Sequence, residues 1–170
     1  MKLSLETKNK IIEILNSPEF KSNLYEGLDE QTRTELGQFY TPAEVCIEML
    51  EMYKTDTFAD KTILDPCCGS GNLLIAMLIA GADSNKIYGN DYDINAVKLC
   101  RKRVNRACDI LGKPYIQWYQ IHKGNALDSF CLSYFAPDYK DKIKQHYLES
   151  QYGLFPILTP EQEEFIKEID

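Results

Sequence analysis

Five alternating segments between Lys61 and Ile121 constrain the fold of this chain more than any other feature. The runs KTILDP and KIYGND have the length and apolar content of short strands, and each ends at an acid. Two runs are typical of helices, GNLLIAMLIAGA, in which Gly81 stops the helix, and INAVKLCRKRVNRACDIL. The run YIQWYQI alternates like a third strand. Strand, helix, strand, helix, strand predicts an α/β fold with a parallel sheet and right-handed crossovers.

The second of these helices is expected to be amphipathic. Its inward stripe is predicted to be Val97, Cys100, Val104, Ala107 and Leu111. Its basic residues then belong to a solvated outer face, which comprises Lys98, Arg101, Lys102, Arg103 and Arg106.

The segment before this alternation is predicted to be helical. Residues 1–36 carry turn signals at Ser17-Pro18 and at Gly27, and the run KNKIIEILN places four apolar residues mainly on one stripe: Ile11, Ile12, Ile14 and Leu15. In GQFYTPAEVCIEMLEMY, Thr41 is an expected N-cap, Pro42 suits the first helical position, and Glu44 completes a capping box. The buried face predicted for this helix is Val45, Met49, Leu50 and Tyr53.

Composition and charge set limits on the kind of protein. The chain has 170 residues, of which 44% are hydrophobic and 26% charged, as in a soluble globular domain. No apolar run approaches the roughly 18 residues of a membrane helix and no signal peptide opens the chain, so we expect a cytoplasmic protein. The net charge of −7 argues against binding DNA or RNA without a partner that supplies basic surface.

The chemistry is expected at the run DPCCGSGNLL, between the first strand and the first helix. Gly69 and Gly71 allow a sharp turn and a close approach of the backbone to a ligand. The run lacks the third glycine of the dinucleotide fingerprint and the Lys-Ser/Thr of a Walker loop. Asp65, which precedes the glycines, suits a ligand with a cationic amine and would repel a diphosphate.

A second acid, Asp91, ends the next strand, 26 residues after Asp65. The ribose-binding acid of dinucleotide sites lies about 20 residues beyond the glycine turn. Ligands of parallel sheets bind at the carboxyl ends of strands, where both acids are expected. A nucleoside that carries an amino-acid-like cation meets these requirements, and S-adenosylmethionine is such a molecule.

Six cysteines are expected to be free buried thiols in a reducing compartment. They form no CxxC pair and have no histidine partner at zinc-like spacing, so we predict no metal site.

Four segments, GQFYTP, DPCCGSGNLL, YGNDYDINAV and GNAL, occur in the order found in amino-methyltransferases of DNA. The chain resembles the N6-adenine DNA methyltransferase family, and within it the modification subunits of type I restriction systems, over residues 36–128. The resemblance implies a Rossmann-like S-adenosylmethionine-dependent methyltransferase sheet, parallel and incomplete, preceded by an N-terminal helical segment. The domains expected are a helical segment 1–36, a cofactor-binding core 37–128, and an extension 129–170 that ends in a helix.

The resemblance also implies roles for single residues. The methionine end of the cofactor would be lined by Phe39, Tyr40, Thr41 and Pro42, with its amine at Asp65. Four residues would shape the turn, Pro66, Cys67, Gly69 and Gly71, and two would begin the helix beneath it, Asn72 and Leu73. Asp91 would hold the ribose hydroxyls, and the adenine would meet Tyr92, Asn125 and Ala126.

The catalytic motif of the family, Asn or Asp followed by Pro-Pro and an aromatic residue, does not occur in the sequence. The nearest run, APDY at 136–139, lacks the leading polar side chain, so catalytic residues stay unassigned. Two hypotheses remain: the cofactor-binding part of a split or partner-dependent DNA methyltransferase, or a module that binds cofactor or restriction partners without methyl transfer. Methylation of RNA or of protein glutamine is a third possibility, which the missing motif weakens equally.

Partners are expected for a physical reason. An incomplete sheet leaves an edge strand open to aggregation. We therefore predict that a terminal helix, a second protein chain or another copy of this chain covers that edge, and that DNA is bound only together with a partner.

Overall fold

The computed structural model describes residues 2–21 and 40–126. The chain divides into two compact units, Met1–Asn125 and Ala126–Asp170, and the description below concerns the first unit together with Ala126. The predictions for Gly27, Phe39, the APDY run and the terminal helix lie outside the described residues, and the predicted domain boundaries stay predictions.

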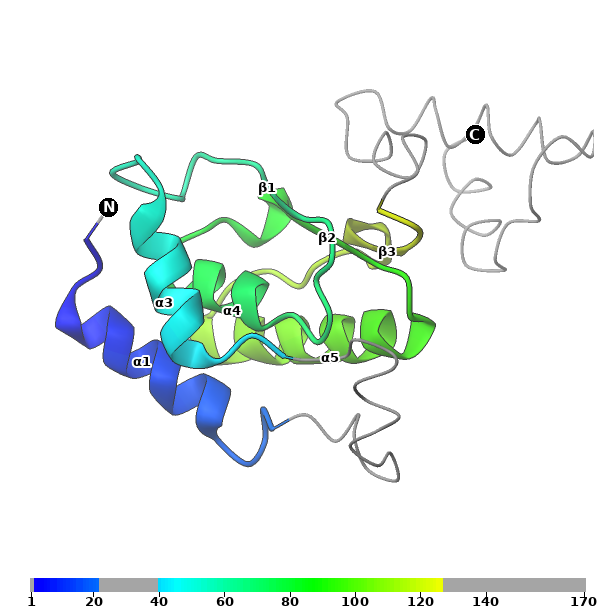
Figure 1. Ribbon diagram of the computed structural model, residues 1–170, viewed down its shortest axis with the longest axis horizontal. Coiled ribbons are helices and arrows are strands. Elements are labelled where there is room, and N and C mark those ends of the chain that lie inside the picture. Colours follow the sequence, from blue (N-terminus) through cyan, green and yellow to red (C-terminus); the bar gives the residue numbers. More distant parts are fainter. Residues whose placement is uncertain (1, 22–39, 127–170) are drawn as a thin grey trace, which may run out of the picture. The chain divides into compact units, whose positions relative to one another are not determined.

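Three parallel strands form the sheet in the order β1-β2-β3 (Figure 1). They are β1 (Ile63–Asp65), β2 (Ile87–Asp91) and β3 (Ile121–Lys123). The register pairs Asp65 with Gly89 and Asp91 with Lys123, so all three strands run toward the same end of the sheet. The predicted α/β fold with a parallel sheet is confirmed.

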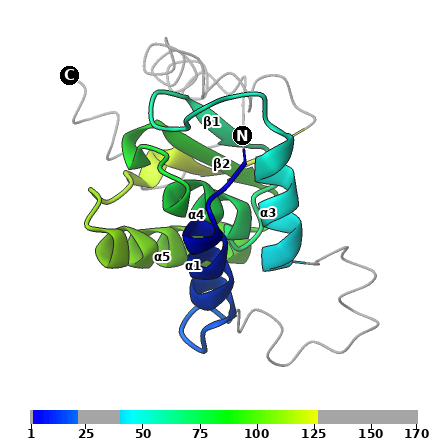
Figure 2. The same ribbon diagram turned by 90° about the vertical axis from the view of Figure 1, so that its left-hand side faces the viewer.

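Two helices make the crossovers between the strands, α4 (Asn72–Ile79) and α5 (Ile94–Leu111). Both lie on the same face of the sheet, as Figures 1 and 2 show from two directions. Right-handed crossovers between neighbouring strands that advance in one direction require this arrangement. Because α4 lies between the sheet and further helices, its residues Leu74 to Leu78 are all buried.

Two N-terminal helices complete the described core by packing against α4. They are α1 (Leu5–Asn16) and α3 (Ala43–Met52), which also contact each other. Ser4 caps α1 by accepting a hydrogen bond from the Thr7 backbone N–H, and the helix ends at Asn16 with Ser17 as its C-cap, at the predicted turn. Of the four residues predicted for the apolar stripe, Ile12 does not belong to the buried face because it is 36% exposed. The other three, Ile11, Ile14 and Leu15, are buried.

The structure corrects two predictions for α3. Its N-cap is Pro42, in an extended conformation, and no side chain caps the helix, so the capping box led by Thr41 does not form. The buried face is also different: of the predicted residues Leu50 is buried, but Val45 and Tyr53 are 40% and 49% exposed. Apolar residues of α3 occur on more than one side of the helix, so its sequence fits two alternative buried stripes. Contacts with α1 and α4 decide between them, and the residues that are buried are Ala43, Cys46, Ile47 and Leu50.

The third strand lies further along the chain than predicted. Residues Trp118–Gln120 form a 3₁₀ turn, and β3 begins only at Ile121. The buried Gln120 explains the difference, because its amide nitrogen donates to the carbonyls of Ser84 and Ile87. Its amide oxygen accepts from the Gln117 backbone N–H. Gln120, which was predicted to be a polar residue of an alternating strand, therefore closes a turn instead.

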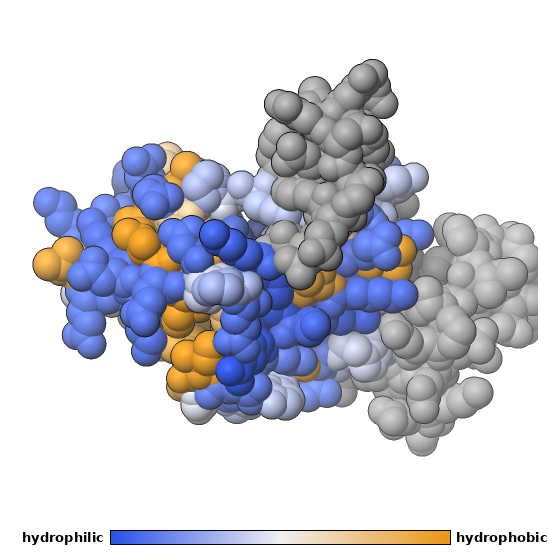
Figure 3. Space-filling model, turned by 90° about the horizontal axis from the view of Figure 1, so that it is seen from below, coloured by the Kyte–Doolittle hydropathy of each residue, from blue (hydrophilic) through white to orange (hydrophobic). Residues whose placement is uncertain are grey.

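The surface seen from the side of α1 and α5 is mainly hydrophilic. Figure 3 shows hydrophobic side chains gathered toward one end of this view, the side on which Figure 1 places α1. Among the described residues, none of the helices has the length and apolar character needed to cross a membrane.

Candidate cofactor site at the strand ends

The turn between β1 and α4 is built on two glycines in the left-handed region, Gly69 with φ 51° and Gly71 with φ 86°. Gly71 is also the N-cap of α4. A Cβ at Gly71 would lie 2.6 Å from the Cys100 Sγ atom, so the backbone of the turn passes directly over α5. Both the dihedral angle and the space available therefore require glycine at this position.

Asp91 joins this turn to the next one. One oxygen of its carboxylate accepts from the Gly69 backbone N–H at 2.8 Å, and the other accepts from the Asp93 backbone N–H at 2.9 Å. A carboxylate has about four acceptor positions, so each oxygen can take a further hydrogen bond from a ligand hydroxyl. Asp91 thus shapes the glycine turn in addition to the ribose-binding role implied by the family resemblance.

Asp65 lies at the entrance of the turn, at the same end of the sheet as Asp91. Its carboxylate accepts from the Cys67 backbone N–H at 3.2 Å. Burial raises the pKa of Asp65 above its usual value, and the charge of Asp91 adds to this effect. A partly desolvated carboxylate beside a second one gains electrostatically from a bound cation.

A small cavity of about 40 Å³ opens between the turn and the segment before α3. Its volume suits a compact group such as an ammonium ion and is far below the roughly 300 Å³ of a drug-sized ligand pocket. Three of the lining residues were predicted for the methionine end and four for the turn or the helix start. The full lining is Tyr40, Thr41, Asp65, Cys67, Cys68, Gly69, Ser70, Asn72 and Leu73.

The other predicted residues within the described ranges do not line this cavity. Pro66 and Gly71 belong to the turn, and Pro42 caps α3. After β3, the Gly124 backbone N–H donates to the Asp91 carbonyl at 2.9 Å, which brings the start of the turn before Asn125 beside the end of β2. Tyr92, on the other side of Asp91, is 78% exposed.

Sequence reasoning missed the structural role of Asn90. This side chain is fully buried, and its amide nitrogen donates to the carbonyls of Pro66 at 3.1 Å and Gly124 at 3.0 Å. Asn90 therefore ties the turn after β1 to the turn after β3. An amide within the otherwise buried run IYGND was the available signal.

Sequence reasoning also misplaced Arg103, which was assigned to the outer face of α5. It is 5% exposed, and its guanidinium donates to the Ser70 carbonyl, the Phe20 carbonyl and the Asn72 side-chain oxygen. Its spacing from Cys100 and Ala107, three residues after one and four before the other, places it beside the buried stripe. That spacing could have identified it.

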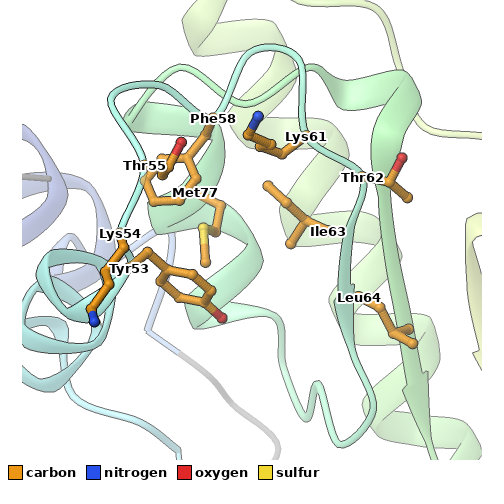
Figure 4. A pocket seen from close by; sticks show the side chains of 9 residues that line it. All are labelled: Tyr53, Lys54, Thr55, Phe58, Lys61, Thr62, Ile63, Leu64 and Met77. Carbon is orange, nitrogen blue, oxygen red and sulfur yellow. The ribbon is translucent and has the colours of Figure 1, made fainter.

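A second, larger cavity of about 410 Å³ lies beside β1 (Figure 4). Two aromatic rings on its wall, Tyr53 and Phe58, meet edge to face with their centroids 5.8 Å apart. The lining contains the cationic residues Lys54 and Lys61 and no acid. A cationic ligand therefore has no counter-charge in this cavity, whereas the strand-end site provides two.

The described cysteines are unpaired thiols. Burial raises the pKa of Cys46 to about 12 and that of Cys108 to about 11. Cys67 differs from the prediction because it is exposed at the cavity. Within residues 2–21 and 40–126, no three His, Cys, Asp or Glu side chains lie close enough together to hold a metal ion.

Comparison with known proteins identifies a family whose sequence pattern this chain matches. The family model described as N-6 DNA Methylase matches residues 20–128. The chain is 36% identical over 94 residues to the type II methyltransferase M.VspI of Vibrio sp. (strain 343), a match that covers 55% of this chain and 23% of that protein. It is 52% identical over 60 residues to the uncharacterized protein MG259 of Mycoplasma genitalium, covering 35% of this chain and 12% of that protein.

The matched region thus spans less than a quarter of the length of these relatives. No solved structure matches the chain. The narrower likeness to type I modification subunits stays a prediction.

Proposed function

The chain belongs to the N-6 DNA methylase family, and on this basis we propose that its strand-end site binds S-adenosylmethionine. The observation that carries the proposal is the pair of acids at neighbouring strand ends around a glycine turn, with Asp65 partly desolvated. When bound, this cofactor supplies a methyl group on a sulfonium, which makes the methyl electrophilic.

The residues present fit such a ligand. The cavity beside Asp65 has room for the ammonium group of the cofactor. Burial and the charge of Asp91 disfavour the ionised Asp65 carboxylate, so a cation bound beside it would be electrostatically favourable. The methionine end would lie between the turn and the segment Tyr40–Pro42, together with Phe39 outside the described residues. The nucleoside is too large for this cavity and would lie over the open strand ends.

For the nucleoside we propose contacts with Asp91 and with the residues beside it. The free acceptor positions of Asp91 suit the ribose hydroxyls. The adenine would meet Tyr92, Asn125 and Ala126, and the 78% exposure of Tyr92 leaves its ring available for stacking.

We further propose that this chain contributes the cofactor half of a methyl transfer to adenine in DNA. The 170 residues contain no Asn-Pro-Pro-aromatic run, so the groups that accept hydrogen bonds from the target amine would come from outside this sequence, for example from a second polypeptide. Basic surface for the DNA phosphates would also come from outside it, because this sequence has a net charge of −7.

The missing motif also favours a second candidate, a module that binds the cofactor without transferring its methyl group. In that case its partner is a protein of a restriction system and not a catalytic subunit. Both candidates share the cofactor site, and they differ only in whether a methyl group reaches DNA.

Titration calorimetry of the full chain with S-adenosylmethionine tests the shared site. Wild type and Asp60→Asn should bind the cofactor alike, because Asp60 is an exposed acid paired with Lys61. Asp65→Asn should weaken binding at least tenfold, since it removes the counter-charge of the amine. Absence of binding to the wild type, or equal binding by Asp65→Asn, would reject the site.

Transfer of a tritiated methyl group then separates the two candidates. The chain is mixed with the product of a neighbouring reading frame that carries the Asn-Pro-Pro-aromatic run, and with DNA that contains or lacks adenine. Labelling that depends on both chains and on adenine supports the split enzyme. Cofactor binding without any labelling supports the binding module.

A further inference from the structure

One buried cation contacts three separate parts of the chain. The guanidinium of Arg103, on α5, donates to the Ser70 carbonyl and the Phe20 carbonyl, each at 2.6 Å, and to the Asn72 side-chain oxygen at 2.7 Å. It also lies over the Phe20 ring, 5.8 Å from the centroid. Arg103 thus joins the segment after α1 to the glycine turn and to the first residue of α4.

This arrangement is costly as a source of stability alone. Burial lowers the pKa of Arg103, yet a guanidinium stays charged in proteins. Among the described residues no carboxylate pairs with it, its three acceptors are neutral, and its Nε atom is buried without a partner. Burying a charge without an opposite one is unfavourable, and well-packed apolar residues often replace such groups without loss of stability.

The contacts of Arg103 fix the turn that lines the strand-end cavity. The Ser70 carbonyl lies between the two left-handed glycines, so its hydrogen bond sets the orientation of the peptide plane before Gly71. The bond to Asn72 leaves that side chain's amide nitrogen to donate to the Thr41 carbonyl at 2.8 Å. The wall of the cavity formed by Thr41 is therefore held against the turn through Asn72.

We propose that Arg103 is a positioning residue for the methionine end of the cofactor: it holds the glycine turn, Asn72 and Thr41 in the binding geometry, and couples them to the segment at Phe20. The inference rests on the proposed function. It assigns Arg103 no contact with the ligand, because both terminal nitrogens donate to protein groups and the Nε atom is buried.

Two ligands that differ only at the amino-acid end test this inference. S-adenosylhomocysteine carries the amino-acid group, whereas 5′-methylthioadenosine has the same nucleoside and sulfur without it. In Arg103→Met, affinity for S-adenosylhomocysteine should fall at least tenfold, while affinity for 5′-methylthioadenosine should change less than twofold. Arg103→Lys should show the same pattern, since one ammonium cannot replace a planar fork that reaches three acceptors.

Arg106→Met is the matched control, because Arg106 is an exposed arginine one turn along the same helix that pairs with Glu19. It should bind both ligands as the wild type does. Equal loss of both ligands in the Arg103 variants would indicate a general structural role and overturn the inference. Unchanged binding of both ligands would overturn it as well, whereas a wild type that binds neither ligand would reject the proposed function itself.

A measurement on the wild type covers the case in which the Arg103 variants do not fold. The Phe20 and Lys21 backbone N–H groups donate to the Ser17 carbonyl, in the segment that Arg103 joins to the turn. Because coupling between two sites is reciprocal, S-adenosylhomocysteine should slow hydrogen exchange at these two amides, and 5′-methylthioadenosine should not. Exchange that neither ligand alters, or that both alter equally, would contradict the coupling.

Discussion

At the scale of single residues, Asp65 has opposite effects on folding and on ligand binding. Its pKa is raised in the folded chain by burial and by Asp91. The unfolded chain therefore loses the proton at a lower pH than the folded chain does. The stability contributed by protonated Asp65 is fully present below the unfolded pKa and is lost as the pH rises through the folded pKa. At neutral pH the free protein thus carries a destabilising charge that a cationic ligand would compensate.

Asp65→Asn should for this reason raise the melting temperature of the ligand-free chain at pH 7, while it weakens binding of S-adenosylmethionine. The asparagine oxygen can still accept from the Cys67 backbone N–H, so the turn keeps its hydrogen bond. The gain should shrink as the pH is lowered toward the raised pKa of Asp65, because the wild-type carboxylate then takes up its proton. Thermal unfolding at pH 7 and at a series of lower pH values measures it. A variant less stable than the wild type at pH 7 would contradict this account.

Gly71 and Gly112 separate the cost of conformation from the cost of crowding. Both have positive φ, but a Cβ at Gly112 meets nothing within 4 Å, whereas one at Gly71 meets Cys100. Gly112→Ala should lower the free energy of unfolding by about 1–2 kcal/mol. Gly71→Ala should cost about 1–3 kcal/mol more, because the turn must move away from α5. Chemical denaturation measures both, and equal losses would show that the turn is not packed tightly on α5.

At the scale of elements, the site is made by three turns that follow three parallel strands. Asn90, on the central strand, bonds the carbonyls of the outer two turns, and Asp91 bonds the amide of Gly69. The turn after β1 is therefore held from the sheet by these two residues and from α5 by Arg103. Such support from both sides keeps a short loop in one geometry for a ligand.

Asn90→Ala should lower the free energy of unfolding by about 2 kcal/mol, since the carbonyls of Pro66 and Gly124 lose their shared donor. Asn85→Ala is the matched control, because Asn85 is an exposed amide just before the same strand, and its loss should be within about 0.5 kcal/mol. Urea denaturation of the two variants measures the difference. Similar small losses in both would mean that Asn90 does not tie the turns together.

The order of the central elements could be predicted from sequence because hydrophobic periodicity and the glycines at positions 69, 71 and 81 mark their limits. The face of α3 could not, because apolar residues surround that helix and only contacts with α1 and α4 choose between its stripes. The predicted start of β3 was wrong because the buried Gln120 side chain donates hydrogen bonds to carbonyls that are distant in the sequence.

The same limit applies to the candidate site. The two acids and two glycines were identified from local pattern. Asn90 and Arg103 were missed because their partners lie 24 to 83 residues away in the sequence. A pattern within one helix or strand can indicate that such a side chain is buried, but it does not indicate which distant groups the side chain contacts.

At the scale of the whole molecule, thiol reactivity reports on both the core and the site. Cys46, Cys68, Cys100 and Cys108 are buried, and Cys67 alone among the described cysteines is exposed. Burial, together with Asp65 and Asp91, raises the pKa of Cys67, so its labelling should need a higher pH than that of a free thiol. S-adenosylmethionine should slow labelling of Cys67, because this residue lines the cavity beside Asp65.

Mass spectrometry of iodoacetamide-treated protein measures this protection peptide by peptide. Cys67→Ser provides the control for labelling elsewhere, and unfolding in guanidinium should expose all six thiols of the sequence. Labelling of Cys67 at the same rate with and without the cofactor would count against a ligand at the turn.

An amide ¹H–¹⁵N titration of the full chain with S-adenosylmethionine would locate the cofactor on the protein residue by residue. Our expectation is that the largest shifts occur at the strand-end turns, at Gly69, Gly71, Asp91 and Asn125, and that amides around the larger cavity change little. Shifts that gather at Thr55, Phe58 and Thr62, around the larger cavity, would contradict it, and so would a spectrum that does not change at all.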